Sequence, residues 1–345
     1  MKTILSTLGL LSVLASFTAG AQPVPGVKLP DPWPPGTASD THWGTTVPDP
    51  YRELENVKDE RVQRWLRAQG EAGDQALRQL PGRAALLARV QAPRPHVVNG
   101  VTFTTGQLQG KPVVLLHSGI SMTNAAMNTQ LVLDRFKVTH IVYSGIAGGV
   151  NPVLHIGDVT VPQRWGQYLE VLVARETAPG TFTPPVWMDD VKLPRFGANH
   201  PRPVEVRTTA QPKEHKKFWF DVDPTLLNLA RSIQGTALAD CDAARNCLGH
   251  KPKVVVGGNG VSGPAFVDNA AFRDYTFKTF EANVLDMETA ATAQVAYSNG
   301  VPYIAFRSLS DLAGGGPGEN ELETFFKIAA DNSATVLLAF LAAWK

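Results

Sequence analysis

Two acidic side chains stand where apolar, strand-like stretches end, and they are the first candidates for chemistry. Glu288 follows residues 284–287, and Asp311 follows residues 301–308 closely. Open α/β sheets bind their ligands at the ends of strands, and a carboxyl group among apolar residues can act as a proton donor because burial raises its pKa. Each carboxylate alone could equally cap a helix or face solvent. The pair favours a small-molecule site.

Two glycine-containing stretches are candidates for ligand-binding turns. Residues 144–149 read SGIAGG, and such small residues let a flat ligand approach the backbone closely. Residues 258–263 match G-x-G-x-x-G, but Pro264 follows and no helix opens at the glycines. A dinucleotide site needs that helix, so a dehydrogenase is a remote alternative. The eight histidines show no metal-ligand spacing, and we predict neither a cofactor nor a metal.

Strands alternate with helices from about residue 97 onward, which predicts a layered α/β fold. Strands are expected at 101–105, 112–117, 140–144, 159–162, 253–256, 284–287 and 301–308. Helices are expected at 121–136, 270–280, 288–299 and 319–344. Residues 165–250 are Pro-rich and give no clear pattern. These elements must position the two carboxylates.

The first 92 residues have a different character. Residues 1–21 are typical of a secretory signal, with Lys2, an apolar stretch and a small-residue cleavage site ending at Ala21. The apolar stretch is too short to span a bilayer, so we expect a secreted or periplasmic protein without stable membrane insertion. Residues 22–50 are expected to form a Pro-rich arm and residues 51–92 a helical appendage. The main domain is expected over 93–345.

Part of that appendage resembles another family. Residues 49–57 (DPYRELENV) and 80–83 (LPGR) are similar to the N-terminal segment of prolyl oligopeptidases. The similarity covers about residues 48–90 only, and the chain contains no G-x-S-x-G motif. We therefore interpret the segment as an appendage and predict no peptidase chemistry from it.

Charge and cysteine content narrow the function classes further. The chain of 345 residues carries 32 Lys+Arg against 31 Asp+Glu, so it has no broad basic field for nucleic acid. Its two cysteines, Cys241 and Cys247, lie six residues apart. In an oxidising compartment a short-loop disulfide is the expected state. Zinc is the weaker alternative, because only His250 lies nearby.

Four segments together resemble a known superfamily. They are residues 144–149 with 157–159, 261–269, 286–290 and 307–315. In this order they resemble the nucleoside phosphorylase and nucleosidase superfamily, specifically the methylthioadenosine/S-adenosylhomocysteine nucleosidases, over about residues 97–345. Plant bark and vegetative storage proteins of that superfamily are more similar still, through residues 266–271 and the position of the cysteine pair. The resemblance implies a three-layer α/β/α sandwich with a central mixed sheet, and a dimer or larger homo-oligomer.

The resemblance also implies roles for individual residues. Asp311 would be the catalytic acid near purine N7. Glu288 would accept hydrogen bonds from the ribose hydroxyls, and Phe266 would stack on the purine. The remaining substrate-binding residues would pack on the sugar, orient Asp311 and line the base pocket; they are Met287, Ser310, Ala147 and Gly148.

The residues also bear on the reaction type. Several phosphorylases of the superfamily carry Arg and Ser where this chain has Tyr143 and Ile146, so water is the better nucleophile and a purine nucleosidase is the leading hypothesis. The family domain normally opens with an apolar strand followed by a Glu that activates water, and no matching Glu precedes Val101. The alternatives are a non-catalytic nucleoside-binding or storage-type protein and a purine nucleoside phosphorylase.

Overall fold

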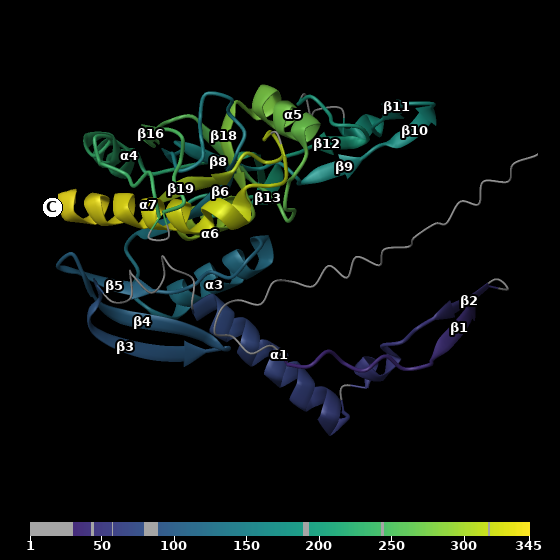
Figure 1. The fold of residues 1–345 in the computed structure, drawn as a ribbon. Helices are drawn as coiled ribbons and strands as arrows, with labels where there is room; N and C mark the ends of the chain where they lie inside the picture. The colour runs from purple at the N-terminus through teal and green to yellow at the C-terminus, as the bar shows by residue number, and fades with distance from the viewer. Residues whose placement is uncertain are drawn as a thin grey trace, which may run out of the picture. The chain divides into compact units, whose positions relative to one another are not determined.

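A computed structural model of the chain describes residues 30–42, 45–56, 58–78, 89–188, 193–242, 245–316 and 318–345 (Figure 1). The predicted signal, residues 1–21, lies outside the described residues. The chain divides into two compact units, residues 1–80 and 81–345, which are described separately.

The first unit combines a strand pair with a helix. Strands β1 (Ser39–His42) and β2 (Thr45–Pro48) pair antiparallel, and a 3-10 turn η1 (Arg52–Glu55) precedes helix α1 (Glu60–Arg78). The helix was expected, but the strand pair was not, because the region was interpreted as a Pro-rich arm. Residues 39–47 contain no proline, so their backbone N–H groups are free to pair. The buried Trp33 meets Trp65 edge-on at 5.9 Å between ring centroids.

The second unit is built on one eight-stranded sheet. Its strand order is β15-β8-β17-β18-β6-β19-β7-β16. The strands are β6 (Ile141–Gly149), β7 (Val159–Val161), β8 (Arg164–Gln167), β15 (Trp219–Asp221), β16 (Val254–Val256), β17 (Asn259–Ser262), β18 (Ala282–Asp286) and β19 (Tyr303–Asp311). Parallel and antiparallel neighbours both occur, as in β6–β19 and β6–β18, which confirms the predicted mixed sheet.

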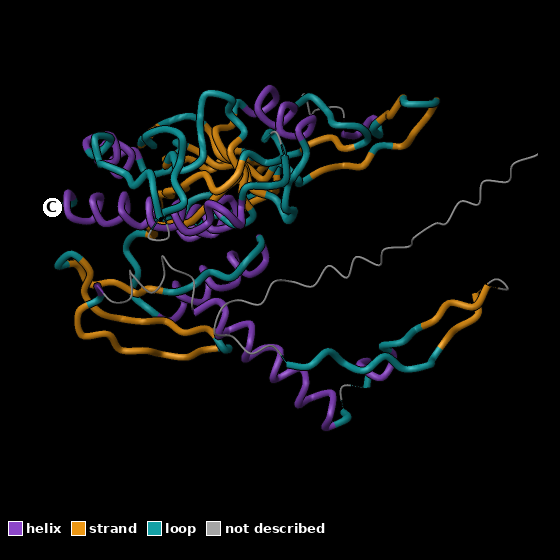
Figure 2. The backbone as a smooth tube through the Cα atoms, viewed as in Figure 1, coloured by secondary structure: helices purple, strands orange, loops and turns teal. Residues whose placement is uncertain are grey.

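Apolar side chains cover both faces of this sheet. Along β18, Val284 belongs to one buried cluster and Leu285 to another, because successive strand residues point to opposite faces. Helices complete the outer layers (Figure 2). They are α4 (Pro224–Ser232), α5 (Ala270–Phe280), α6 (Thr289–Asn299) and α7 (Leu322–Ala343). Helix α3 (Met122–Arg135) packs against α6. The predicted α/β sandwich is therefore confirmed.

Smaller sheets accompany the central one. Strands β3 (Gln91–Val98), β4 (Val101–Leu108) and β5 (Lys111–Leu115) form a three-stranded antiparallel sheet. The region without a clear sequence pattern contains three strand pairs and the 3-10 turn η2 (Val186–Met188). The pairs are β9 (Val171–Val173) with β12 (Asn199–Pro201), β10 (Arg175–Ala178) with β11 (Thr181–Thr183), and β13 (Val204–Val206) with β14 (His215–Lys217).

One edge of β6 is open inside the central sheet. On one side β6 pairs with β19 along its length, but on the other it meets β18 only at Gly148 and Gly149. Residues 141–146 are half-buried, whereas all nine residues of β19 are buried. Among the described residues, no strand from the segment before Val101 fills this edge, because β3 pairs with β4 instead. The apolar first strand expected of the family, with the Glu that follows it, therefore has no counterpart in the described part of the chain.

Helix α7 is long and apolar enough to cross a membrane by length and composition alone. More than half of that stretch, 56%, is buried inside the protein. Its buried residues, among them Ile328, Val336 and Phe340, belong to the folded core. The same composition is thus accounted for by packing against the sheet.

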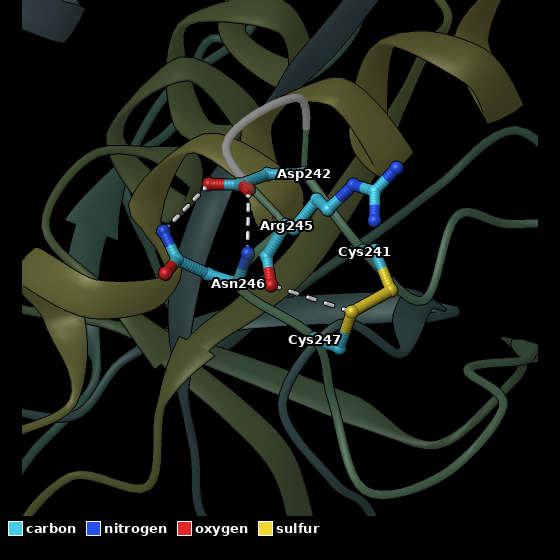
Figure 3. Close-up of a disulfide and its surroundings, with 5 residues drawn as sticks. All are labelled: Cys241, Asp242, Arg245, Asn246 and Cys247. Atoms are coloured by element: carbon cyan, nitrogen blue, oxygen red, sulfur yellow. Dashed lines mark hydrogen bonds between the residues drawn. A yellow bond between two sulfur atoms is a disulfide. The ribbon is translucent and has the colours of Figure 1, made fainter.

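Cys241 and Cys247 are joined by a disulfide (Figure 3). The loop that they close is further held by Asp242, which accepts hydrogen bonds from the backbone N–H and the side-chain amide of Asn246, at 2.9 and 3.0 Å. Arg245 adopts a left-handed conformation in this loop, with φ of 66°. Both cysteines are exposed, so a thiol reductant can reach the bridge.

We expect the native protein to resist thiol labelling until a reductant is added. Replacing both cysteines with serine should lower the free energy of unfolding by about 2 kcal/mol, because the short loop restricts the unfolded chain only modestly. Urea titration and intact-mass analysis after alkylation measure the two effects. Rapid alkylation of both cysteines in native, unreduced protein would contradict the bridge.

Candidate active site

Asp311 is the last residue of β19 and its side chain is buried. Ser310 Oγ donates a hydrogen bond to one carboxylate oxygen at 2.9 Å, and the backbone N–H of Ala313 donates to the other at 2.8 Å. Burial raises the pKa of Asp311, and the two donors act in the opposite direction. The net effect is a raised pKa of Asp311, so its carboxyl keeps a proton at a higher pH than an exposed aspartate does.

Local backbone geometry keeps space for this carboxyl. Ala313 and Gly314 both adopt positive φ angles, 51° and 82°, so the chain turns sharply directly after β19. On the neighbouring strand β6, a Cβ atom at Gly148 would lie 3.1 Å from Asp311 Oδ1. Ala147 O lies 3.4 Å from Ser310 Oγ. The structure therefore brings together four of the predicted site residues, namely Ala147, Gly148, Ser310 and Asp311.

Glu288 lies between the end of β18 and the start of α6, and both of its carboxylate oxygens are held. The backbone N–H of Ser121 donates to Oε1 at 2.9 Å, and Arg307 Nη2 donates to Oε2 at 3.1 Å. Burial raises the pKa of Glu288, although the Arg307 charge acts against that rise. The carboxylate is thus fixed in orientation, with lone pairs left for further donors.

Arg307 is the residue whose role sequence reasoning missed. It lies inside β19, fully surrounded by protein, with Nε 2.7 Å from Asp286 Oδ2 and Nη2 bonded to Glu288. Its guanidinium also lies 4.8 Å from the centroid of the Tyr143 ring. A charged residue inside an apolar strand requires buried partners of opposite charge. That requirement was the available sequence signal, because residues 303–306 are apolar.

The glycine at position 145 is explained by the same arginine. A Cβ atom there would lie 2.2 Å from Arg307 Nη1, and Arg307 Nη1 donates to the carbonyl of Ile146 at 3.0 Å. The strand expected at 140–144 accordingly continues to Gly149, and glycines 145 and 149 make room for the protein's own side chains. The hypothesis that these glycines all serve a ligand is therefore too broad.

Asp286 organises the turn that presents Glu288. It accepts hydrogen bonds from Ser262 Oγ and Thr289 Oγ1 and from the backbone N–H groups of Glu288 and Thr289, the latter two at 3.1 Å. With the Arg307 ion pair added, its oxygens are fully engaged. Its role is to hold neighbouring residues in place.

The strand register places both carboxylates beside β6, with Glu288 bonded to Arg307, which lies opposite Gly145, and Asp311 further along the same strand. Gly148 of β6 lies opposite Leu285 of β18 on one side and opposite Asp311 of β19 on the other. The loop that carries Phe266 is tied to the same place, because the Asn269 N–H donates to Ala313 O at 3.1 Å. The Phe266 side chain is 56% exposed and Met287 is half-buried beside Glu288 in the sequence. The aromatic ring of Phe266 and the thioether of Met287 are thus both accessible to a ligand.

Tyr143 and Ile146, which stand where several phosphorylases carry Arg and Ser, have no cationic side chain that could bind phosphate. Tyr143 Oη lies 2.6 Å from Ser118 Oγ, and burial raises the pKa of Tyr143 to about 12. Arg307 is close to both Tyr143 and Ile146, but two carboxylates already balance its charge. Within the described residues, no group of three or more His, Cys, Asp or Glu side chains could hold a metal ion.

Comparison with known proteins gives a consistent picture. A model of the phosphorylase superfamily matches residues 77–342. A 5'-methylthioadenosine/S-adenosylhomocysteine nucleosidase of Geobacillus thermodenitrificans is 30% identical over 259 residues, covering 75% of this chain and 91% of the relative.

Two solved nucleosidase structures also match, each with 25% sequence identity. The Streptococcus pneumoniae protein with the transition-state inhibitor MT-ImmA has a TM-score of 0.55 and covers 77% of this chain and 96% of its own. The Colwellia psychrerythraea protein in complex with adenine has a TM-score of 0.56, with coverage of 76% and 91%.

The Arg307 ion pairs give a stability prediction. Arg307→Met would leave Asp286 and Glu288 buried without their cation, and we expect a loss of about 3–5 kcal/mol in the free energy of unfolding. Burial already raises the pKa of Glu288, and losing the Arg307 charge raises it further, so Glu288 would bind a proton more readily when folded and the loss should shrink as the pH falls from 8 to 5. Urea titration at both pH values measures it.

Lys278→Met is the matched control. Lys278 forms an exposed ion pair with Asp274 on α5, at 2.7 Å, and breaking such a pair should cost less than about 1 kcal/mol. Equal losses in the two variants would show that the buried ion pairs do not carry the expected stability.

Proposed function

The chain belongs to the phosphorylase superfamily, and on that premise we propose that it is a purine nucleosidase, which uses water to cleave the N-glycosidic bond of a purine nucleoside or thionucleoside. The observation that carries this proposal is that both carboxylates lie beside β6: Asp311 pairs opposite Gly148, and Glu288, just after β18, bonds Arg307, which pairs opposite Gly145. The nucleosidase relatives, at about 30% identity, support the reaction type.

Asp311 is proposed as the acid. When the bond between ribose C1' and purine N9 breaks, its electron pair moves onto the base, and a proton from Asp311 to N7 neutralises the charge that develops there. Such general acid catalysis contributes about 10²–10⁴-fold in rate. Ser310, which donates to Asp311, orients the carboxyl for this transfer.

Glu288 is proposed to bind and stabilise the sugar. The ribose becomes similar to an oxocarbenium ion as the bond breaks, so a nearby carboxylate is worth more in the transition state than in the bound substrate. Glu288 would accept hydrogen bonds from the ribose hydroxyls while Ser121 and Arg307 fix its orientation. Met287 would pack on the sugar, Phe266 on the purine, and Ala147 and Gly148 would line the base pocket.

Water is the proposed nucleophile. A phosphorylase must hold a phosphate dianion, and the cation nearest to Tyr143 and Ile146 is already neutralised by two carboxylates. The oxygen of water would bond to C1' and its proton would leave to solvent or to a nearby base. A phosphorylase is the less favoured candidate on this ground.

One observation favours a second candidate function. Among the described residues, no first strand lies beside the open edge of β6, and the water-activating Glu is expected directly after that strand. A nucleoside-binding or storage-type protein, similar to the plant bark and vegetative storage proteins, would keep the base pocket without turnover.

Export and self-association are further proposals. Residues 1–21 are typical of a secretory signal, and a disulfide between exposed cysteines suits a secreted or periplasmic protein. Cleavage after Ala21 would start the mature chain at Gln22, which intact mass of the exported protein tests. A homodimer is proposed from the family resemblance, and sedimentation tests it. The segment similar to prolyl oligopeptidases, residues 48–90, receives no catalytic role.

Incubation of the mature protein with methylthioadenosine, adenosine and inosine, with and without phosphate, tests the reaction. We expect release of free base without phosphate. Base together with ribose 1-phosphate, formed only when phosphate is present, would support the phosphorylase. Ligand binding without any turnover would support the binding or storage protein.

Asp311→Asn tests the acid. The amide keeps the size of the side chain but has no acidic proton to give, so we expect turnover to fall at least about 100-fold while nucleoside binding, measured by calorimetry, is retained. Asp274→Asn, on the exposed surface of α5, is the control. Unchanged kinetics in Asp311→Asn would remove Asp311 from the mechanism.

A further inference from the structure

The turn after β19 is held by the carboxylate of Glu321, which has no role in the reaction proposed for Asp311 and Glu288. Glu321, the residue immediately before α7, accepts a hydrogen bond from the backbone N–H of Leu312 at 3.4 Å. A Cβ atom at Gly316 would lie 1.7 Å from Glu321 Oε1. The carboxylate therefore occupies the inside of the turn formed by residues 312–316. Leu312 follows Asp311 directly, so this contact sits one residue from the proposed acid.

The charge of Glu321 acts on Asp311 as well as on the turn. The negative charge of Glu321 raises the pKa of Asp311, in addition to the larger effect of burial. A negative side chain at the start of a helix is stabilised by the exposed N–H groups there. The Glu321 carboxylate thus lies at the start of α7 and one residue from Asp311 along the turn that it holds.

Two other polar side chains, Arg273 and Asn320, also lie around this turn. Arg273 of α5 donates from Nε to Gly149 O at 2.9 Å, and its charge is attracted to Glu321. A Cβ atom at Gly315 would meet its side chain at 2.7 Å. Asn320, whose amide donates to Asp268 at 3.1 Å, also bonds Asp311 and lowers its pKa. Arg273 and Asn320 therefore moderate the effect of Glu321, and Glu321 alone among the three repels the Asp311 anion.

We propose that Glu321 is a positioning residue, whose carboxylate fills the 312–316 turn, holds Leu312 and places a negative charge beside the proposed acid Asp311. The inference rests on the proposed role of Asp311 as the acid. It adds a requirement on the reaction: the pH range in which the acid works depends on a carboxylate that touches neither base nor sugar.

Glu321→Gln separates charge from contact. Glutamine keeps an oxygen that can accept from Leu312 but removes the negative charge. Activity that needs protonated Asp311 is lost as the pH rises through its pKa, so the alkaline limb of kcat/KM for methylthioadenosine should move to lower pH. Glu323→Gln, an exposed residue in the first turn of α7, removes the same charge nearby and should leave the limb in place.

A titration that does not depend on turnover keeps the inference testable. The carboxyl ¹³C resonance of Asp311, identified by its loss in Asp311→Asn, should titrate at a lower pH in Glu321→Gln than in the wild type. If the wild type releases no base from any nucleoside, the proposed function fails, yet this titration still decides the role of Glu321. An unchanged Asp311 titration in Glu321→Gln overturns the inference whether or not the protein is active.

Gly316→Ala tests the contact through sterics alone. The added methyl group must displace the Glu321 carboxylate, so this variant should shift the Asp311 titration in the same direction as Glu321→Gln. Combined with Glu321→Ala it should add little, because the displaced group is already gone. Full additivity of the two changes would contradict the proposed arrangement.

Discussion

The ion pairs of Arg307 with Asp286 and Glu288 are the constraint on which the site depends. A guanidinium inside a fully buried strand is tolerated only when opposite charges and acceptors surround it. Here Asp286 and Glu288, at the end of β18, supply the charges, and the Ile146 carbonyl of β6 supplies an acceptor. Arg307 thereby connects three neighbouring strands, β18, β6 and β19. Because Arg307 itself is fixed by the packing of the core, the orientation of the Glu288 carboxylate is fixed as well.

The two carboxyls of the site have opposite surroundings. Glu288 bonds a cation, whereas Asp311 is held by a hydroxyl, an amide and a backbone N–H and is repelled by Glu321. Environments that separate two carboxyls in this way divide the work between a charged group and a proton donor. The residues beside β6 can therefore offer both negative charge to a sugar and a proton to a base.

The sequence pattern alone was sufficient to predict the helices and strands whose apolar residues recur at regular spacing. The helices around Ala270–Phe280 and Thr289–Asn299, with Gly300 in a left-handed cap, follow their apolar spacing and capping residues closely. Side-chain contacts across strands were not predictable, because they depend on register: Arg307 facing Gly145 is a property of the β6–β19 pairing. The short strands between residues 165 and 221 were missed, since each has only three or four residues and too little periodicity to detect.

The half-covered edge of β6 has a consequence for handling the protein. Backbone groups along residues 141–146 lack a neighbouring strand on one side within the described chain, and such a row is a template for pairing with another polypeptide. Its side chains include Ile141, Val142 and Ile146, which are apolar and only half-buried. We therefore expect self-association on warming or concentration to begin at this half-buried edge in the middle of the sheet.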